Sequence, residues 1–362
     1  MARPKQQRID VGRRTAAASG GKAVPAKAKS APAKGRASGS KGRGRSGRPG
    51  GRPIVEARPA TLGTWIAGAR PQTLPLALAA VAIGYGAASN TAAFGVQLWD
   101  HWLRAVGCLV VAIALQIAVN YANDYSDGVR GTDAHRVGPQ RLVGSGRARP
   151  RAVLTVALVF FAIAAIAGVL VVWRSGQWWL LAVGAVCIAA AWFYTGGKRP
   201  YGYSALGELA VFLFFGIVPV AGTVFVLTSS AARIGTVNVE GWLGGVAAGA
   251  LACAVLVVNN LRDIDRDRAA RKRTLAVLIG RVPTLVLYVV LMLVPFVVLI
   301  FFTLFYLNAG YVYFTLIVAL PAIVIVLFGT TPRELVTALQ LTLLTALLFG
   351  LGLGAALLFA PA

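Results

Sequence analysis

The stretch LRAVGCLVVAIALQIAVNYANDYSD, residues 103–127, decides the fold of this chain. As far as residue 122 it is a largely apolar run, near the ~20 residues that cross ~30 Å of hydrocarbon as a helix. It then changes abruptly to Asn and Asp side chains. Ionisable groups in membrane segments are rare and usually functional. The stretch therefore predicts a transmembrane helix that carries a polar site at one end.

The same apolar pattern recurs along the chain. A mean hydropathy of +0.70, with 57% hydrophobic and 13% charged residues, excludes an ordinary soluble domain. We therefore expect an all-α membrane protein with nine transmembrane helices arranged as a bundle. The expected spans are about 73–90, 103–122, 152–173, 178–195, 205–228, 241–261, 283–305, 310–329 and 338–359.

Basic residues indicate the orientation of these helices. Nine spans place four loops on the side of the N-terminus, and these loops carry sixteen Lys and Arg against two, Arg174 and Arg233, on the opposite loops. Loops rich in Lys and Arg remain in the cytoplasm. Tryptophan rings settle at the headgroup level, and they mark the outer ends of spans at Trp99, Trp102, Trp173, Trp178, Trp179 and Trp242. The pattern predicts a cytoplasmic N-terminus and a C-terminus outside.

The beginning of the chain has a different composition. Residues 1–52 carry fifteen Lys and Arg against one acidic residue, Asp10, and have no apolar periodicity. Such a segment cannot bury enough surface to offset its ordering entropy. We expect a disordered basic cytoplasmic tail over 1–58 and a nine-helix domain over 59–362. Because the tail precedes a membrane domain, attraction to the anionic lipid bilayer fits its charge better than a specific nucleic-acid partner.

Acidic residues concentrate in two places. The second is NNLRDIDRD, residues 259–267, at the end of the span 241–261; together with residues 120–133 it holds six of the twelve Asp and Glu of the chain. If both helices continue a turn beyond the membrane, the spacings i,i+3 and i,i+4 put polar groups on shared faces. The pairs are Asn120 with Asp124, Asn123 with Asp127, Asp124 with Asp127, and Asp263 with Asp267.

Carboxylates at this spacing repel one another unless a cation lies between them. The chain has two His, and its three Cys lie in apolar runs, so a bound metal would have oxygen ligands. Mg²⁺ fits, because it is usually held by one or two carboxylates together with substrate phosphates. Cations suited to phosphate are expected on the same side of the membrane. They are Arg70, Arg141, Lys198, Arg199, Arg262, Lys272 and Arg273.

Other interpretations of the acidic residues stay open. They could be solvated or form ion pairs with neighbouring Arg, above all Asp133 and Asp265, which break the helical spacing. A cation or proton transporter could also use such carboxylates. The dense basic residues favour a bound anion instead, and the carboxylates lie at the ends of spans, not midway.

The two acidic motifs resemble those of the UbiA superfamily of intramembrane aromatic prenyltransferases. Its NDxxD-type motif after the second helix and DxxxD-type motif after the sixth match Asn123–Asp127 and Asp263–Asp267. Over about 65–360 the chain looks most like the branch acting on 1,4-dihydroxy-2-naphthoate in menaquinone biosynthesis. The stretches that carry this likeness are 69–75, 138–141, 194–203, 207–208, 259–263 and 272–277.

The chain departs from the family pattern at two positions. A third family aspartate would fall on Gly131, so Asp133 is only a candidate for it. Arg271 stands where Gly is expected, which should matter little on a polar loop.

The resemblance implies a bundle in the plasma membrane of a bacterium, with a diphosphate site at the cytoplasmic mouth of a central cavity. A polyprenyl chain would pass from its diphosphate to 1,4-dihydroxy-2-naphthoate, with loss of diphosphate and CO₂, giving demethylmenaquinone. Another acceptor, 4-hydroxybenzoate or homogentisate, stays open as an alternative. Mg²⁺ would be bridged by the catalytic carboxylates of Asp124, Asp127, Asp263 and Asp267.

The expected substrate-binding residues are Arg70, Asn120, Asn123, Arg141, Tyr194, Lys198, Arg199, Tyr201, Asn259, Asn260, Arg262, Lys272 and Arg273. Tyr194, Tyr201 and Tyr203 are candidates for orienting the aromatic acid, although an interfacial aromatic belt would explain them equally. Glu208 lies just inside a span, where an unpaired charge is costly, so we expect a partner such as a nearby Arg or Lys.

Overall fold

The structure is a computed structural model that describes residues 59–91, 98–131 and 141–360. Within these ranges the chain is helical, and the extended pairing is limited to two isolated bridges. The predicted all-α class is therefore confirmed for the part of the chain that the structure describes. The predicted tail over 1–58 and the candidate Asp133 lie outside the described residues.

The helices follow the predicted spans closely. The first half contains α1 (Leu62–Gly68), η1 (Pro71–Thr73), α2 (Pro75–Ser89), α3 (Leu98–Arg130), α4 (Pro150–Ser175) and α5 (Leu180–Phe193). After η2 (Tyr201–Tyr203), one span consists of α6 (Gly207–Phe212), the π-helix η3 (Leu213–Ile217) and α7 (Val218–Thr228). The second half contains α8 (Val239–Ala269), α9 (Leu275–Ile279), α10 (Arg281–Phe305), η4 (Leu307–Thr315), α11 (Leu316–Phe328) and α12 (Pro332–Leu358).

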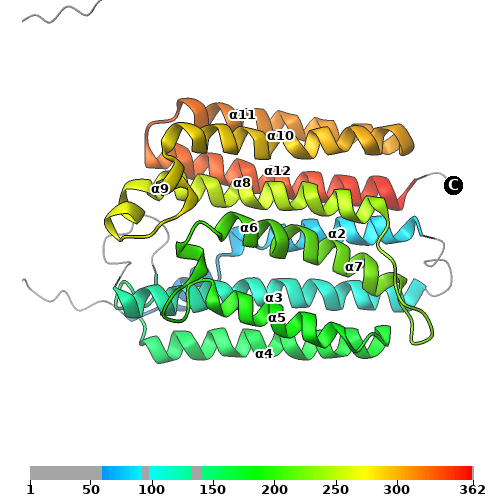
Figure 1. Ribbon diagram of the computed structural model, residues 1–362, viewed down its shortest axis with the longest axis horizontal. Coiled ribbons are helices and arrows are strands. Elements are labelled where there is room, and N and C mark those ends of the chain that lie inside the picture. The colour runs from blue at the N-terminus through cyan, green and yellow to red at the C-terminus, as the bar shows by residue number, and fades with distance from the viewer. Residues whose placement is uncertain (1–58, 92–97, 132–140, 361–362) are drawn as a thin grey trace, which may run out of the picture. The chain divides into compact units, whose positions relative to one another are not determined.

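The long helices of the described domain lie side by side (Figure 1). Helices α3, α4 and α5 form one side of this bundle, α8, α10, α11 and α12 form the other, and α2 and α7 lie between them. Helix α2 packs against α12, α7, α8 and α3, so it lies in the interior of the bundle. Most residues of α2 are therefore buried against other helices and do not face the lipid.

Seven helical segments in the described ranges are long and apolar enough to cross a membrane. The chain is therefore a multi-pass membrane protein, as predicted. Two of the nine expected spans, 73–90 and 178–195, are not single helices of full membrane-spanning length. Residues 62–73 and 75–89 form a pair bent by 41°, and α5 has fourteen residues, or roughly 21 Å at 1.5 Å per residue. The bend coincides with Pro71 and Pro75, which interrupt helical hydrogen bonding.

The outward faces of the helices are apolar, as a lipid environment requires. Ile166 on α4 and Val186 on α5 are 63% and 61% exposed. Trp102, Trp173 and Trp242 are at least 42% exposed, and they lie near the ends of helices, as a tryptophan at the headgroup level would.

Small residues bring α2 and α12 into backbone contact. A Cβ atom added to Gly86 would lie 2.3 Å from the carbonyl oxygen of Gly354, and one added to Gly350 would lie 2.4 Å from Cβ of Ala79. Such close approach lets transmembrane helices gain van der Waals contact that larger side chains prevent. The seam between the first and the last long helices of the domain is therefore closed.

Helices α3 and α8 continue beyond the predicted ends of their spans, to Arg130 and Ala269. Both acidic motifs therefore lie on helix, as the pairing of polar residues at i,i+3 and i,i+4 requires. Their C-terminal ends lie at the same end of the bundle (Figure 1), and a contact between Asp127 and Lys272 joins them.

Candidate active site

Asp124 anchors a turn against the end of α3. Its carboxylate accepts hydrogen bonds from the backbone N–H groups of Leu142 and Val143, at 2.8 and 3.1 Å, and the residue is 3% exposed. Gly128, one turn further along α3, makes room for this approach, since a Cβ there would lie 2.4 Å from Cγ1 of Val143. Asp124 therefore fixes the position of the turn that carries Arg141.

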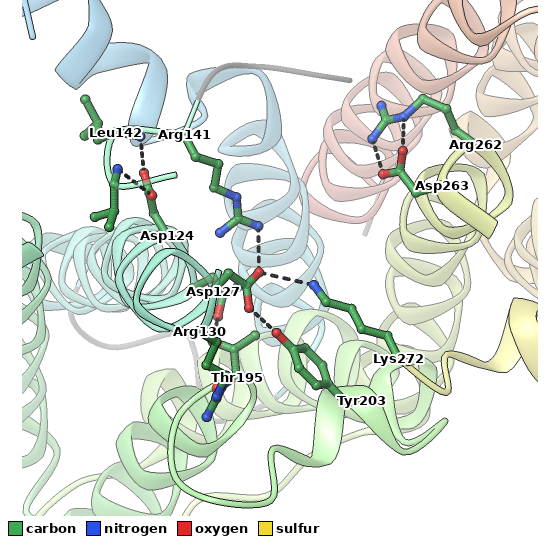
Figure 2. Close-up of polar contacts among 12 residues, drawn as sticks. Asp124, Asp127, Arg130, Arg141, Leu142, Thr195, Tyr203, Arg262, Asp263 and Lys272 are labelled. Atoms are coloured by element: carbon green, nitrogen blue, oxygen red, sulfur yellow. Dashed lines mark hydrogen bonds and ion pairs between the residues drawn. The ribbon is translucent and has the colours of Figure 1, made fainter. Parts of the chain in front are cut away.

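Asp127 is the centre of a buried charge cluster. Its carboxylate lies 3.2 Å from Nη2 of Arg141 and 3.5 Å from Nζ of Lys272, and it accepts a hydrogen bond from the hydroxyl of Tyr203. Figure 2 shows these groups converging from three separate segments of the chain. The residue is only 2% exposed, and a buried carboxylate requires such compensation.

The end of α8 positions Lys272. The N–H of Lys272 bonds to the carbonyl of Asp267 at 2.8 Å, and the N–H of Arg271 bonds to the carbonyl of Arg268 at 3.1 Å. This is the Schellman pattern, which places a residue in the left-handed conformation just after the helix. That residue is Arg271, with φ of 57°. The substitution of the expected glycine therefore does matter, because a side chain is strained at this backbone conformation.

On α8 the carboxylates have cationic neighbours. Arg262 holds Asp263 through two contacts, at 3.1 and 2.7 Å, and Arg266 lies 3.8 Å from the same carboxylate. The side chain of Asp265 is 91% exposed and lies 3.4 Å from Arg268. Asp265 is thus a solvated residue that pairs with a neighbouring Arg, whereas Asp263 is buried.

The donor set suits a hard divalent ion only in combination with phosphate. Within the described ranges, no three His, Cys, Asp or Glu side chains lie close enough together to hold a metal ion. Mg²⁺ needs only one or two carboxylates when substrate phosphates complete its shell. The candidate carboxylates are Asp127 on α3 and Asp263 and Asp267 on α8, whereas Asp124 accepts hydrogen bonds from the backbone of a turn. The assignment of all four as metal ligands stays a prediction.

A cavity of about 580 Å³ extends into the bundle beside this cluster. Its wall is mostly apolar, and a set of polar side chains lies on the segments nearest the acidic motifs. Six of the expected substrate-binding residues line it: Arg70, Asn120, Asn123, Tyr194, Tyr201 and Asn259. Asn123 lines the cavity and is followed directly by Asp124, so the polar end of the cavity lies at the first acidic motif.

The other expected substrate-binding residues do not line this cavity. Arg141 and Lys272 contact Asp127, Arg262 contacts Asp263, and the amide of Asn260 donates to Glu208. The remaining three are exposed: Lys198, Arg199 and Arg273.

Polar groups of α3 hold Arg70 at the cavity. The amide of Asn120 donates to the carbonyl of Ala69 at 2.9 Å, and that of Gln116 donates to the carbonyl of Thr73 at 2.7 Å. Between these contacts Arg70 adopts φ of 54°, an uncommon conformation for a residue with a side chain. Gln116 and Thr73 were not predicted, although Gln116 lies four residues before Asn120 in an apolar span.

The loop after α5 is tied to α3. The hydroxyl of Thr195 donates to Oδ1 of Asn123 at 2.6 Å, and Arg130 donates to the carbonyls of Thr195 and Gly197. Thr195 was not predicted as a site residue. No charge or unusual spacing distinguishes it in the sequence.

The three candidate tyrosines have different positions. Tyr194 and Tyr201 line the cavity with their rings 5.5 Å apart, whereas Tyr203 contacts Asp127. The hydroxyl of Tyr201 donates to the carbonyl of Ala190 at 2.7 Å. Burial raises the pKa of Tyr201 to about 12, so the phenol stays neutral near pH 7.

Glu208 has an amide partner. Its carboxylate accepts a hydrogen bond of 2.9 Å from Asn260. The expectation of Arg or Lys as the partner is therefore corrected. An amide satisfies an acceptor without adding a second charge to the membrane interior.

The sequence profile of the UbiA prenyltransferase family matches residues 77–334, which contain most of the cavity wall and both acidic motifs. This chain belongs to the UbiA prenyltransferase family. The resemblance seen in the motifs is thereby confirmed.

Several relatives within the UbiA family carry one name, 1,4-dihydroxy-2-naphthoate octaprenyltransferase. That of Mycobacterium tuberculosis is 46% identical over 83% of this chain and 98% of its own length. That of Mycobacterium leprae is 50% identical over 63% of this chain and 74% of its own length. That of Escherichia coli is 36% identical over 68% of this chain and 78% of its own length.

Solved structures agree with the UbiA fold. An apo UbiA homolog from Aeropyrum pernix matches with a TM-score of 0.59 at 16% identity, covering 77% of this chain and 96% of that one. A UbiA homolog from Archaeoglobus fulgidus bound to GPP and Mg²⁺ matches with a TM-score of 0.50 at 14% identity, covering 81% of this chain and 99% of that one.

Proposed function

We propose that this UbiA family member transfers a polyprenyl chain from its diphosphate to 1,4-dihydroxy-2-naphthoate in menaquinone biosynthesis. The observation that carries the proposal is an apolar cavity lined by Asn123, which lies one helical turn before Asp127 and its cations on α3. An amphiphilic donor with a charged head and an apolar tail matches that combination. The relatives named for this reaction, at 36% to 50% identity, support the acceptor.

The reaction is a substitution at the allylic carbon. The bond between C1 of the prenyl group and the diphosphate oxygen breaks, and the electron-rich naphthoate ring forms the new bond to C1. The carboxyl group leaves as CO₂, and the ring becomes aromatic again. Both ring hydroxyls remain, so the direct product is the hydroquinone of demethylmenaquinone. Removal of two electrons in a separate oxidation then gives the quinone.

Arg141 and Lys272 bind the diphosphate of the donor. Both are nearly buried and already lie at Asp127, so they can share the charge that develops on the leaving group in a site with little water. Arg262 has the same task on α8, beside Asp263. When bound, Mg²⁺ would supply Lewis-acid stabilisation of the diphosphate, and the phosphate oxygens would hold it together with one or two of the carboxylates of Asp127, Asp263 and Asp267.

The acceptor binds between Arg70 and the two cavity tyrosines. Arg70 offers a planar guanidinium to the carboxylate of the aromatic acid. Tyr194 and Tyr201 are perpendicular to each other and offer an aromatic surface beside it. Asn120 contributes indirectly, because it holds the backbone next to Arg70.

The apolar wall of the cavity keeps water from the reactive allylic carbon. Water would otherwise compete with the naphthoate ring for the carbocation-like C1. The charged mouth of the cavity faces the cytoplasm, where both substrates' polar groups are soluble, and the C-terminus lies outside. This orientation follows from the distribution of Lys and Arg between the loops.

A reconstituted assay tests the proposal. Purified protein in liposomes receives a polyprenyl diphosphate, Mg²⁺ and one of three acceptors: 1,4-dihydroxy-2-naphthoate, 4-hydroxybenzoate or homogentisate. We expect release of diphosphate and CO₂ with the naphthoate. Asp127→Asn should lower turnover by about 100-fold or more, whereas Asp265→Asn, at an exposed carboxylate, should not. Prenyl transfer to another acceptor alone, or to none of them, would refute the proposal.

A further inference from the structure

The wall of the cavity carries a polar atom that the proposed acceptor contacts do not use. Gln116 on α3 lines the cavity and is 5% exposed. Its Oε1 atom is buried and has no hydrogen-bond partner among the residues that the structure describes. Such an acceptor is costly to leave unpaired, and most buried polar groups in native proteins are paired. The unpaired oxygen therefore indicates a hydrogen-bond donor that a ligand supplies.

A hydrogen bond to the backbone fixes the orientation of this amide. Nε2 of Gln116 donates to the carbonyl oxygen of Thr73 at 2.7 Å. If the amide were turned over, two oxygen atoms that can only accept would face each other. Oε1 is therefore the atom that remains for a ligand. Because it accepts and cannot donate, the ligand group must be a hydroxyl or an N–H group.

Other polar side chains of the cavity wall have partners in the protein. The hydroxyl of Thr223 donates to the carbonyl of Pro219 at 2.6 Å, and that of Tyr201 donates to the carbonyl of Ala190. Among the described residues that line the cavity, Gln116 is the one with a buried polar atom that lacks a partner. The wall thus singles out one position for a polar contact with a ligand.

Gln116 lies deeper in the bundle than the group proposed to bind the carboxylate. It is one helical turn before Asn120, whose amide holds the carbonyl of Ala69 next to Arg70. Its partner Thr73 follows Arg70 by one 3₁₀ turn, a rise of about 6 Å. The guanidinium-bearing residue and the unpaired oxygen therefore follow one another along the wall. Such a pair suits a ligand with two polar substituents on one ring.

The two hydroxyl groups of 1,4-dihydroxy-2-naphthoate have different needs. The 1-hydroxyl is next to the carboxylate and can donate to it within the molecule. The 4-hydroxyl lies on the opposite side of the same ring and has no internal partner. In an apolar cavity this hydroxyl needs an acceptor from the protein, because an unpaired polar group is costly to bury. The donor that the ligand must place and the acceptor that Gln116 offers are complementary.

We propose that Gln116 selects the acceptor, with its Oε1 atom accepting a hydrogen bond from the 4-hydroxyl of the naphthoate. This inference rests on the proposed function, in which Arg70 binds the carboxylate. Because the departing carboxyl group is next to the 1-hydroxyl, that hydroxyl activates the carbon that is prenylated, and the 4-hydroxyl serves recognition. An acid without a hydroxyl at this position leaves Oε1 unpaired and is rejected.

Two acids test this role in the reconstituted protein. The measured preference is the ratio of kcat/KM for 1,4-dihydroxy-2-naphthoate to that for 1-hydroxy-2-naphthoate, which lacks the 4-hydroxyl. We expect a wild-type preference of about 100-fold or more, and Gln116→Met should lower it by about tenfold or more. Loss of the Thr73 contact alone would slow both acids equally and leave the preference unchanged. An unchanged preference in Gln116→Met would overturn the inference.

Thr223→Val is the matched control. It also removes a polar group from the cavity wall, but that hydroxyl is paired within its own helical segment. We expect Thr223→Val to keep the wild-type preference. Gln116→Asn, which withdraws the amide by one methylene, is a second variant and should lose preference as Gln116→Met does. Equal loss in Thr223→Val would show a general dependence on the polarity of the wall and refute a specific contact.

A binding measurement separates this inference from the proposed function. Each acid is titrated without prenyl donor into the wild-type protein and into Gln116→Met, with Mg²⁺ and inorganic diphosphate present and oxygen excluded. We expect the wild-type protein to bind the dihydroxy acid more tightly, by about tenfold or more, and Gln116→Met to lose most of this difference. Selective binding without any prenyl transfer would retain the role of Gln116 and reject the function. Prenyl transfer to the naphthoate with the same preference in both proteins would retain the function and reject the role.

Discussion

Lys272 lies 3.5 Å from Asp127, although 145 residues separate them along the chain. The contact joins the loop that follows α8 to the C-terminal end of α3, and Arg141 reaches the same carboxylate from a third segment at 3.2 Å. The end of the first acidic motif and the loop that follows the second therefore meet at Asp127, while Asp263 of the second motif pairs separately with Arg262 and Arg266. Two cations on one carboxylate are poised to bind a diphosphate that brings more negative charge.

Lys272→Met should weaken donor binding and turnover together. The change removes one of the cations that balance the diphosphate in a nearly buried site, so we expect kcat/KM for the donor to fall by about 100-fold. Lys272→Arg should recover part of the loss. Arg268→Met, at an exposed position that pairs with Asp265, is the control and should retain kcat/KM. Steady-state kinetics in liposomes would reveal a structural role if all three variants lost activity equally.

Tyr203→Phe should alter the site through Asp127. The hydroxyl of Tyr203 donates to this carboxylate, and its ring lies 4.6 Å from Nζ of Lys272. Hydrogen bonds to charged groups contribute about 1.5–3 kcal/mol, so we expect kcat/KM to fall by roughly tenfold or more and the Mg²⁺ half-saturation to shift. Lack of any change in the Mg²⁺ dependence would show that Tyr203 does not position Asp127.

The fold was predictable because apolar length and charge distribution are local properties of the sequence. Runs near 20 residues identified the long helices, and Asn120, Asp124 and Asp263 identified the end that carries the site. What could not be predicted was how each carboxylate is used. Asp124 and Asp127 are three residues apart, yet one accepts backbone N–H groups of a turn and the other meets two cations.

Tertiary packing decided the remaining differences. Lys198 and Arg199 share the composition of a phosphate site but are exposed, whereas Gln116 and Thr195 carry no charge and hold the segments around the cavity. Position 271 favours glycine only because it is the left-handed residue just after α8. The sequence alone does not locate the end of this helix to a single residue.

Arg271→Gly should stabilise the protein. Arg271 occupies the left-handed position of the Schellman motif with φ of 57°, where a side chain costs about 1–2 kcal/mol. Glycine removes that cost, and the greater freedom of its unfolded chain offsets part of the gain. Arg268→Gly, three residues earlier and inside the helix, should instead destabilise by about 1 kcal/mol. Thermal unfolding in detergent distinguishes them, and a lower Tm for Arg271→Gly would contradict the capping geometry.

The ionisation of Tyr201 should matter only at high pH. Its pKa is raised to about 12 by burial, so the folded protein favours the neutral phenol more than the unfolded chain does. The resulting stability is complete below the unfolded pKa of ~10 and is lost as pH rises from there to about 12. The Tyr201→Phe variant has no phenol at this position, so its stability should not show this loss with pH. Alkaline unfolding curves of the two proteins in detergent should diverge above pH ~10, and parallel curves would contradict the buried position.

Gly86→Ala should open the seam between α2 and α12. The added Cβ would lie 2.3 Å from the carbonyl oxygen of Gly354, so the helices must separate, at a cost of about 1–3 kcal/mol. Gly184→Ala makes the same chemical change in α5, where the Cβ meets nothing within 4 Å, and should stabilise by roughly 0.5–1 kcal/mol through lower unfolded-state entropy. The two variants should therefore shift Tm in opposite directions. A neutral Gly86→Ala would show that α2 and α12 are not in backbone contact.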